Sequence, residues 1–80
     1  MTKIEELREK ANRLPLLPGV YIMLDASGKV IYVGKAKALK NRVTSYFRGD
    51  HLPKVAAMVS HVNDFNVIIA ETEFEALVLE

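Results

Sequence analysis

Hydrophobic residues near the start of the chain recur every three or four positions, which predicts an amphipathic helix. Thr2 and Glu5 form a T-x-x-E capping box that begins this helix, and Pro15 ends it. Its apolar stripe consists of Ile4, Leu7, Ala11 and Leu14.

A different pattern follows the turn signal Pro18-Gly19. The runs VYIML (20–24) and VIYV (30–33) are β-branched or aromatic, and the short segment DASGK separates them. This arrangement predicts a β-hairpin. We expect Gly34 to end the second strand, because glycine weakens a strand interior.

The length of the hairpin loop decides which side chains share a face of the sheet. A two-residue turn opposes Met23 to Tyr32 and Tyr21 to Gly34, so both tyrosines point the same way. A three-residue loop without a bulge places them on opposite faces. A site shared by the two tyrosines therefore requires an even loop or a bulge.

Helical spacing returns in the second half of the chain. Residues 38–47 are predicted to form a helix, with Arg42 and Tyr46 in a row beside its apolar side. A short helix is expected after Pro53, the run FNVIIA (65–70) reads as a third strand, and a capping box of Thr72 and Glu75 opens a last helix. The apolar positions of these helices are Leu39, Val43 and Phe47, then Val55, Val59 and Val62, then Phe74, Leu77 and Val78.

This order of elements predicts an α+β fold in which a small antiparallel or mixed sheet packs against helices. The 80 residues suit one small domain, residues 1–80. The apolar period of the last helix runs to Glu80 without a stop signal, so we interpret the chain as the N-terminal fragment of a larger multidomain protein.

Composition narrows the class of protein. Half of the residues are hydrophobic, which indicates a globular domain, and no apolar run reaches the length of a transmembrane helix. The chain has no cysteine and no signal-peptide pattern, which fits a cytoplasmic protein and excludes disulfides and thiolate zinc sites. We expect no association with a membrane.

Charge is distributed unevenly although the net charge is only +1. A basic block contains Lys29, Lys35, Lys37, Lys40, Arg42, Arg48 and Lys54, and an acidic segment contains Asp64, Glu71, Glu73, Glu75 and Glu80. The basic block suits a polyanion such as nucleic acid, and the acidic segment could hold a divalent cation. Two solvated faces of opposite sign explain the same pattern equally well.

The individual residues allow both structural and functional interpretations. Each strand tyrosine is explained by burial of its ring, and Arg42 with Tyr46 by a solvated helix face. Gly34 is harder to explain structurally, because a glycine within a strand often lets a ligand approach the backbone, and Lys35 follows it. The chain has no Walker loop, zinc motif or serine nucleophile elbow.

The motifs taken together match a known family. The triads GVY (19–21) and YVG (32–34), the string GKAKALKNRVTSYF and the terminal ETEFEALVLE closely resemble the GIY-YIG nucleases. The match is strongest to their UvrC branch, the bacterial nucleotide excision repair nucleases, and it covers essentially the whole chain. Valine replaces isoleucine in both triads, which preserves a β-branched apolar residue.

The resemblance implies a three-stranded antiparallel sheet flanked by helices and hydrolysis of a DNA phosphodiester with one divalent ion, Mg²⁺ or Mn²⁺. It assigns the catalytic set to Tyr21, Tyr32, Gly34, Lys35, Arg42 and Tyr46, and the metal to Glu80. Tyr32 is expected to act as general base, Arg42 to stabilise the phosphate, and Tyr21 and Tyr46 to position phosphate or water. Contacts to DNA phosphates are expected from Lys37, Lys40 and Arg48.

The resemblance also implies a biological setting. The substrate would be damaged double-stranded DNA, presented by UvrB to the full-length protein and cut on the 3′ side of the lesion. The fragment itself is expected to be monomeric. Two alternatives stay open: a nucleic-acid-binding module without catalysis, and a stand-alone GIY-YIG nuclease with another substrate.

Overall fold

A computed structural model describes residues 2–48 and 52–70. The three strands form one sheet in the order β2-β1-β3, with both pairs antiparallel. This confirms the predicted α+β class and settles the sheet as antiparallel, not mixed. Along the chain the elements are α1 (Lys3–Asn12), β1 (Gly19–Leu24), β2 (Val30–Ala36), α2 (Leu39–Tyr46), α3 (Pro53–His61) and β3 (Asp64–Ile69).

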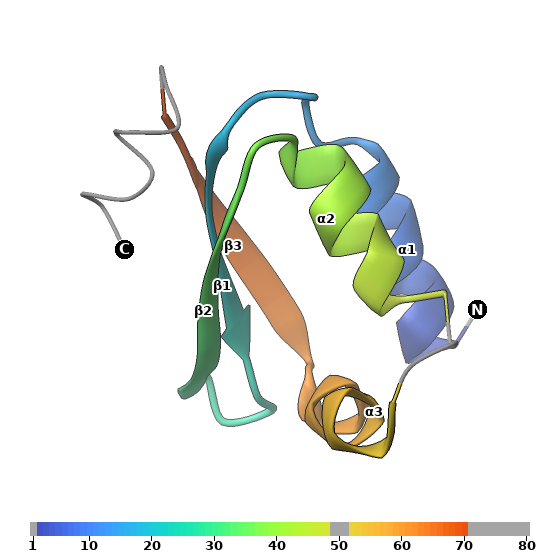
Figure 1. The fold of residues 1–80 in the computed structure, drawn as a ribbon. Coiled ribbons are helices and arrows are strands. Elements are labelled where there is room, and N and C mark those ends of the chain that lie inside the picture. Colours follow the sequence, from blue (N-terminus) through green and yellow to red (C-terminus); the bar gives the residue numbers. More distant parts are fainter. Residues whose placement is uncertain (1, 49–51, 71–80) are drawn as a thin grey trace.

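The three helices lie on the same side of the sheet (Figure 1). Helices α1 and α2 lie side by side, and α3 lies near the end of the sheet at which β3 begins. The main core fills the space between this helical layer and the sheet. Its largest fully buried side chains include Phe47 from the end of α2, Phe65 from β3 and Met23 from β1. Among the described residues, no helix is long and apolar enough to cross a membrane.

The local signals for α1 and α2 are confirmed. The Thr2 side chain accepts a hydrogen bond from the Glu5 backbone N–H at 3.2 Å and so caps the first turn of α1. The apolar side of α2 is completely buried, as predicted, at Leu39, Val43 and Phe47. The predicted third helix and third strand also occur, as α3 and β3.

The hairpin has the register in which Tyr21 and Tyr32 share a face, but its loop is odd and a bulge compensates. Asp25 N–H donates to the Lys29 carbonyl at 2.9 Å, so residues 26–28 form an odd tip, with Gly28 in the left-handed region at φ 85°. Of the two alternatives that the sequence left open, an even loop or a bulge, the structure has the bulge. A bulge beyond Met23 then restores the alternation, so Tyr21 pairs with Gly34 and Met23 with Tyr32.

The second strand is longer than expected. Gly34 does not end it, because β2 continues to Ala36. The last predicted helix, with its capping box at Thr72 and Glu75 and the candidate metal ligand Glu80, lies outside the described residues.

Candidate active site

Three tyrosines from three elements converge on the helical side of the sheet. Tyr21 of β1, Tyr32 of β2 and Tyr46 of α2 have ring centroids 5.6 to 6.3 Å apart. They are the only tyrosines in the sequence. We call this group the tyrosine cluster. The register of the hairpin produces it, because the bulge keeps both strand tyrosines on one face.

Gly34 has a clear reason to be glycine. A Cβ built on Gly34 would overlap the ring and hydroxyl of Tyr21, which lies directly across from it in the sheet. The group that approaches this backbone is thus the phenol of Tyr21, and the phosphate expected from the sequence is not needed to explain the glycine. Gly34 shapes the cluster by letting Tyr21 lie flat across β2.

Tyr21 and Tyr46 form a hydrogen-bonded pair. Their hydroxyl oxygens are 2.7 Å apart, and Tyr21 is only 2% exposed. Burial raises the pKa of Tyr21 well above its usual value, and the hydrogen bond to Tyr46 raises it further. Burial also raises the pKa of Tyr46, although the hydrogen bond from Tyr21 acts in the opposite direction. Both phenols therefore stay protonated near neutral pH, and one of them donates its O–H to the other.

Tyr32 differs from this pair in its access to solvent. It is 41% exposed, whereas Tyr21 is nearly inaccessible. A molecule outside the protein can therefore reach the Tyr32 hydroxyl directly. Of the three phenols, Tyr32 is the one best placed to exchange a proton with a bound water or substrate.

Arg42 supplies positive charge beside the cluster. It lies one turn before Tyr46 on α2 and is exposed. Its charge favours the ionised form of both Tyr21 and Tyr46, although burial outweighs that influence. The structure thus brings together Tyr21, Tyr32, Gly34, Arg42 and Tyr46 from the predicted catalytic set.

The other predicted cations are placed differently. Lys35 pairs with Val20 and so points to the face of the sheet opposite the tyrosines. Lys40 comes two residues before Arg42, about 200° around the axis of α2, and so lies on the other flank of the helix. Lys37 and Arg48 are exposed just before and just after α2. Only Arg42 among these basic residues is positioned by its element to face the cluster.

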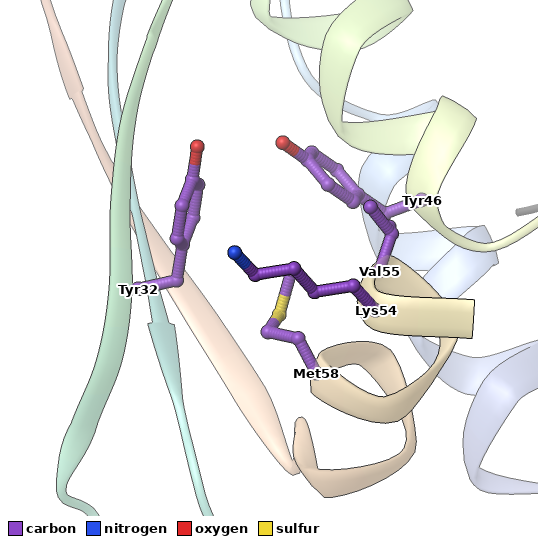
Figure 2. A pocket seen from close by; sticks show the side chains of 5 residues that line it. All are labelled: Tyr32, Tyr46, Lys54, Val55 and Met58. Carbon is purple, nitrogen blue, oxygen red and sulfur yellow. The ribbon is translucent and has the colours of Figure 1, made fainter. Parts of the chain in front are cut away.

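A small pocket adjoins the cluster and extends to α3. Its volume is about 240 Å³, and its lining is mostly apolar. Figure 2 shows the Lys54 side chain reaching from α3 toward the space between the Tyr32 and Tyr46 rings. The sequence had placed Lys54 in the basic block without a specific role and had not singled out Met58. The pocket is lined by Tyr32, Tyr46, Lys54, Val55 and Met58.

The described residues do not by themselves build a metal site. Within residues 2–48 and 52–70 there is no group of three histidine, aspartate or glutamate side chains that could hold an ion. The cluster offers phenols and cations, whereas Mg²⁺ prefers carboxylate and water oxygens. A metal would thus require a carboxylate from elsewhere in the chain, and the predicted ligand Glu80 lies outside the described part.

Comparison with known proteins gives the family. A family model for the UvrC-like GIY-YIG domain matches residues 17–80. The chain belongs to this family. UvrABC system protein C of Moorella thermoacetica is 63% identical over 75 residues, covering 94% of this chain and 12% of that protein. The corresponding protein of Desulfitobacterium hafniense is 58% identical over 79 residues, covering 99% of this chain and 13% of that protein.

A solved GIY-YIG domain has the same fold. The N-terminal endonuclease domain of UvrC from Thermotoga maritima, bound to magnesium as its catalytic cation, matches with a TM-score of 0.85 and 38% identity. The match covers 100% of this chain and 85% of that one. Variants of the Thermotoga domain with a single tyrosine-to-phenylalanine substitution are also bound to the catalytic divalent cation.

Proposed function

We propose that this chain is a metal-dependent DNA endonuclease domain that hydrolyses a phosphodiester on the 3′ side of a lesion in bacterial nucleotide excision repair. The observation that carries the proposal is the division within the tyrosine cluster. The phenols of Tyr21 and Tyr46 are hydrogen-bonded to each other and stay protonated. The third phenol of the cluster, Tyr32, is exposed to solvent, and Arg42 adds positive charge nearby.

Each role follows from placement. Tyr32 orients the attacking water through its accessible hydroxyl, and it would accept a proton from that water only as the phenolate, which thereby returns to the neutral phenol. Tyr21 is buried and holds Tyr46 in place through the hydrogen bond between them, and Tyr46 donates a hydrogen bond to the phosphate or the water. Arg42 binds the scissile phosphate and stabilises the charge that develops on it. Gly34 keeps Tyr21 in position.

The cofactor is one Mg²⁺ or Mn²⁺ ion, held by Glu80 with water and phosphate oxygens. When bound, such an ion polarises the phosphate and stabilises the leaving oxygen. The magnesium in the Thermotoga domain supports this assignment. Lys35 faces the other side of the sheet at the edge strand β2, so we assign it a contact to substrate phosphate and not the activation of Tyr32.

Binding of DNA outside the cluster needs no recognition of sequence. Lys37, Lys40 and Arg48 flank or lie on α2 and contact backbone phosphates, which gives affinity that falls with salt. The relatives belong to the UvrABC system, which supports damaged double-stranded DNA as substrate and presentation by UvrB to the full-length protein. The chain itself acts as a monomer in the cytoplasm.

The competing function is a nucleic-acid-binding module without catalysis. It would use the same cations but would not need Glu80. The test is metal-dependent nicking and DNA binding by wild type and Glu80→Ala in the full-length protein, with Glu6→Ala as a control on the outer face of α1. We expect Glu80→Ala to lose nicking and keep binding. Equal nicking by both proteins would contradict the proposal.

A further inference from the structure

The pocket beside the tyrosine cluster has a composition of its own. Val55 and Met58 provide aliphatic and thioether surface, the Tyr32 and Tyr46 rings provide aromatic surface, and Lys54 provides one ammonium group. The Lys54 side chain makes no ion pair or hydrogen bond with any residue that the structure describes. A cation at the edge of an apolar pocket, without a partner among residues 2–48 and 52–70, suits a ligand that has a flat apolar part and an anionic part.

The position of the pocket limits what can fill it. Tyr32 and Tyr46 belong both to the cluster and to the pocket wall (Figure 2). A DNA strand whose phosphate lies at Tyr32 and Arg42 must therefore place an adjoining nucleoside at or beside the pocket. A volume of about 240 Å³ is below the range of ~300 to 1,000 Å³ usual for ligand sites, so it fits a single base or sugar.

We propose that this pocket holds the base of the nucleotide next to the scissile phosphate, with Lys54 on the phosphate of that nucleotide. The inference rests on the proposed function, because it uses the phosphate position that Tyr32 and Arg42 define. Aromatic surface stacks on any base, and the flexible side chain of Met58 adapts to different shapes. The pocket therefore recognises that a base is present and not which base it is.

Binding of single strands tests the pocket separately from cleavage. The probes are a labelled oligothymidylate and a strand of equal length that lacks bases, measured by fluorescence anisotropy with chelator present. Single strands are used because their bases are already unstacked. We expect wild type to bind the strand without bases about tenfold more weakly, the size of one stacked base.

Variants on α3 assign that difference to the pocket. Val55→Phe fills the pocket and should bring the ratio of the two affinities close to one. Ala56→Phe is the matched control, since it adds the same ring to an exposed position of the same helix and should leave the ratio unchanged. Met58→Ala should lower the ratio of the two affinities in part. If Val55→Phe does not fold, the Met58→Ala variant replaces it in the experiment.

The cation is tested by Lys54→Met, which keeps the length of the stem. It should weaken both strands by the same factor and reduce the salt slope by about 0.7. Lys3→Met makes the same charge change on α1 and should alter neither value.

Three results would overturn the inference. They are equal affinity of wild type for both strands, an affinity ratio that is unchanged in Val55→Phe and Met58→Ala, and no binding of either strand. Failure of the proposed function looks different, since nicking would then be absent while the ratio persists. If the protein nicks DNA but binds the strands with and without bases equally well, the base-binding role of the pocket is contradicted and the nuclease function stands.

Discussion

Two regions on the helical side of the sheet use polar groups in opposite ways. In the anchor region, formed by Arg8, Lys10, Phe47, Asp64 and Phe65, every charged group is bonded within the protein. Arg8 donates to the Phe47 carbonyl from Nε at 2.9 Å and from Nη2 at 2.7 Å, which ties α1 to the end of α2. Lys10 Nζ donates to Asp64 Oδ1 and to the Phe65 carbonyl, both at 2.6 Å, which ties α1 to β3.

The tyrosine cluster has the reverse arrangement. The hydrogen bond between Tyr21 and Tyr46 joins two neutral phenols, and the side chains of the nearby cations Arg42 and Lys54 have no ion pair or hydrogen bond with the described residues. The pKa shifts differ accordingly. Burial alone would raise the pKa of Asp64, but the hydrogen bond from Lys10 lowers it overall, whereas the pKa of Tyr21 is raised by burial.

This difference separates stability from reactivity. Charges that are paired internally stabilise the fold, and charges left for a ligand do not. The same helix serves both regions, because α2 carries Val43 and Phe47 into the core and Arg42 and Tyr46 to the cluster. Substitutions in the two regions should consequently change different measurements.

The largest expected effect outside the three phenols is that of Arg42→Lys in the full-length protein. Lysine keeps the charge but loses the planar fork that binds two phosphate oxygens. We expect the rate of 3′ incision to fall about 10²- to 10³-fold and the free energy of unfolding to change by less than about 0.5 kcal/mol. Arg13→Lys, at the C-cap of α1, is the control, and a similar loss of rate in that variant would contradict the difference between the two regions.

The next effect concerns the glycine that the cluster needs. Gly34→Ala places a methyl group against Tyr21, so the free energy of unfolding should fall by about 1–3 kcal/mol in denaturant titrations. The cost should largely disappear when Tyr21→Ala removes the ring. A cost of the same size in both backgrounds would show that Tyr21 is not the reason for the glycine.

The anchor region gives a smaller effect of the opposite kind. Arg8→Met removes two charge-assisted hydrogen bonds to the carbonyl of the buried residue Phe47 and should cost about 1–2 kcal/mol in the free energy of unfolding. Incision by the folded protein should be unchanged. Arg13→Met breaks only the exposed pair with Glu9 and should cost less than about 0.5 kcal/mol. An equal loss in the free energy of unfolding for Arg8→Met and Arg13→Met would contradict the stabilising role of the bonds from Arg8 to the Phe47 carbonyl.

The smallest expected effect is that of Tyr21→Phe on how folding stability depends on pH. The folded-state pKa of Tyr21 and that of Tyr46 lie above the unfolded value near 10. The stability that their protonated forms contribute is therefore complete below about pH 10 and is lost as the pH rises beyond it. Thermal melts between pH 8 and 11 should show a steeper alkaline loss for wild type than for Tyr21→Phe. Parallel curves would contradict the raised pKa of Tyr21.

Most of the fold could be predicted because its signals are local. The capping box at Thr2, the apolar rows of α2 and Pro53 at the start of α3 each mark an element by its own sequence. The hairpin tip stayed open between two alternatives, because an odd loop combined with a bulge gives the same alternation as an even loop. Only the pairing across strands distinguishes them.

The candidate site was predictable in part for the same reason. Tyr32, Arg42 and Tyr46 lie close together in sequence, so their grouping follows from one strand and one helix. The contact that explains Gly34 comes from β1, and the pocket wall of Lys54 and Met58 comes from α3. These are contacts between elements, which no local pattern specifies. Glu80 stays a prediction.

The central claim is that the exposed phenol performs the chemistry while the two buried phenols position it. Tyr32→Phe in the full-length protein removes one hydroxyl and leaves the ring in the cluster. We predict that 3′ incision of damaged DNA in the presence of Mg²⁺ falls about 10²- to 10⁴-fold, with binding of DNA retained. Incision by Tyr32→Phe at the wild-type rate would contradict the account.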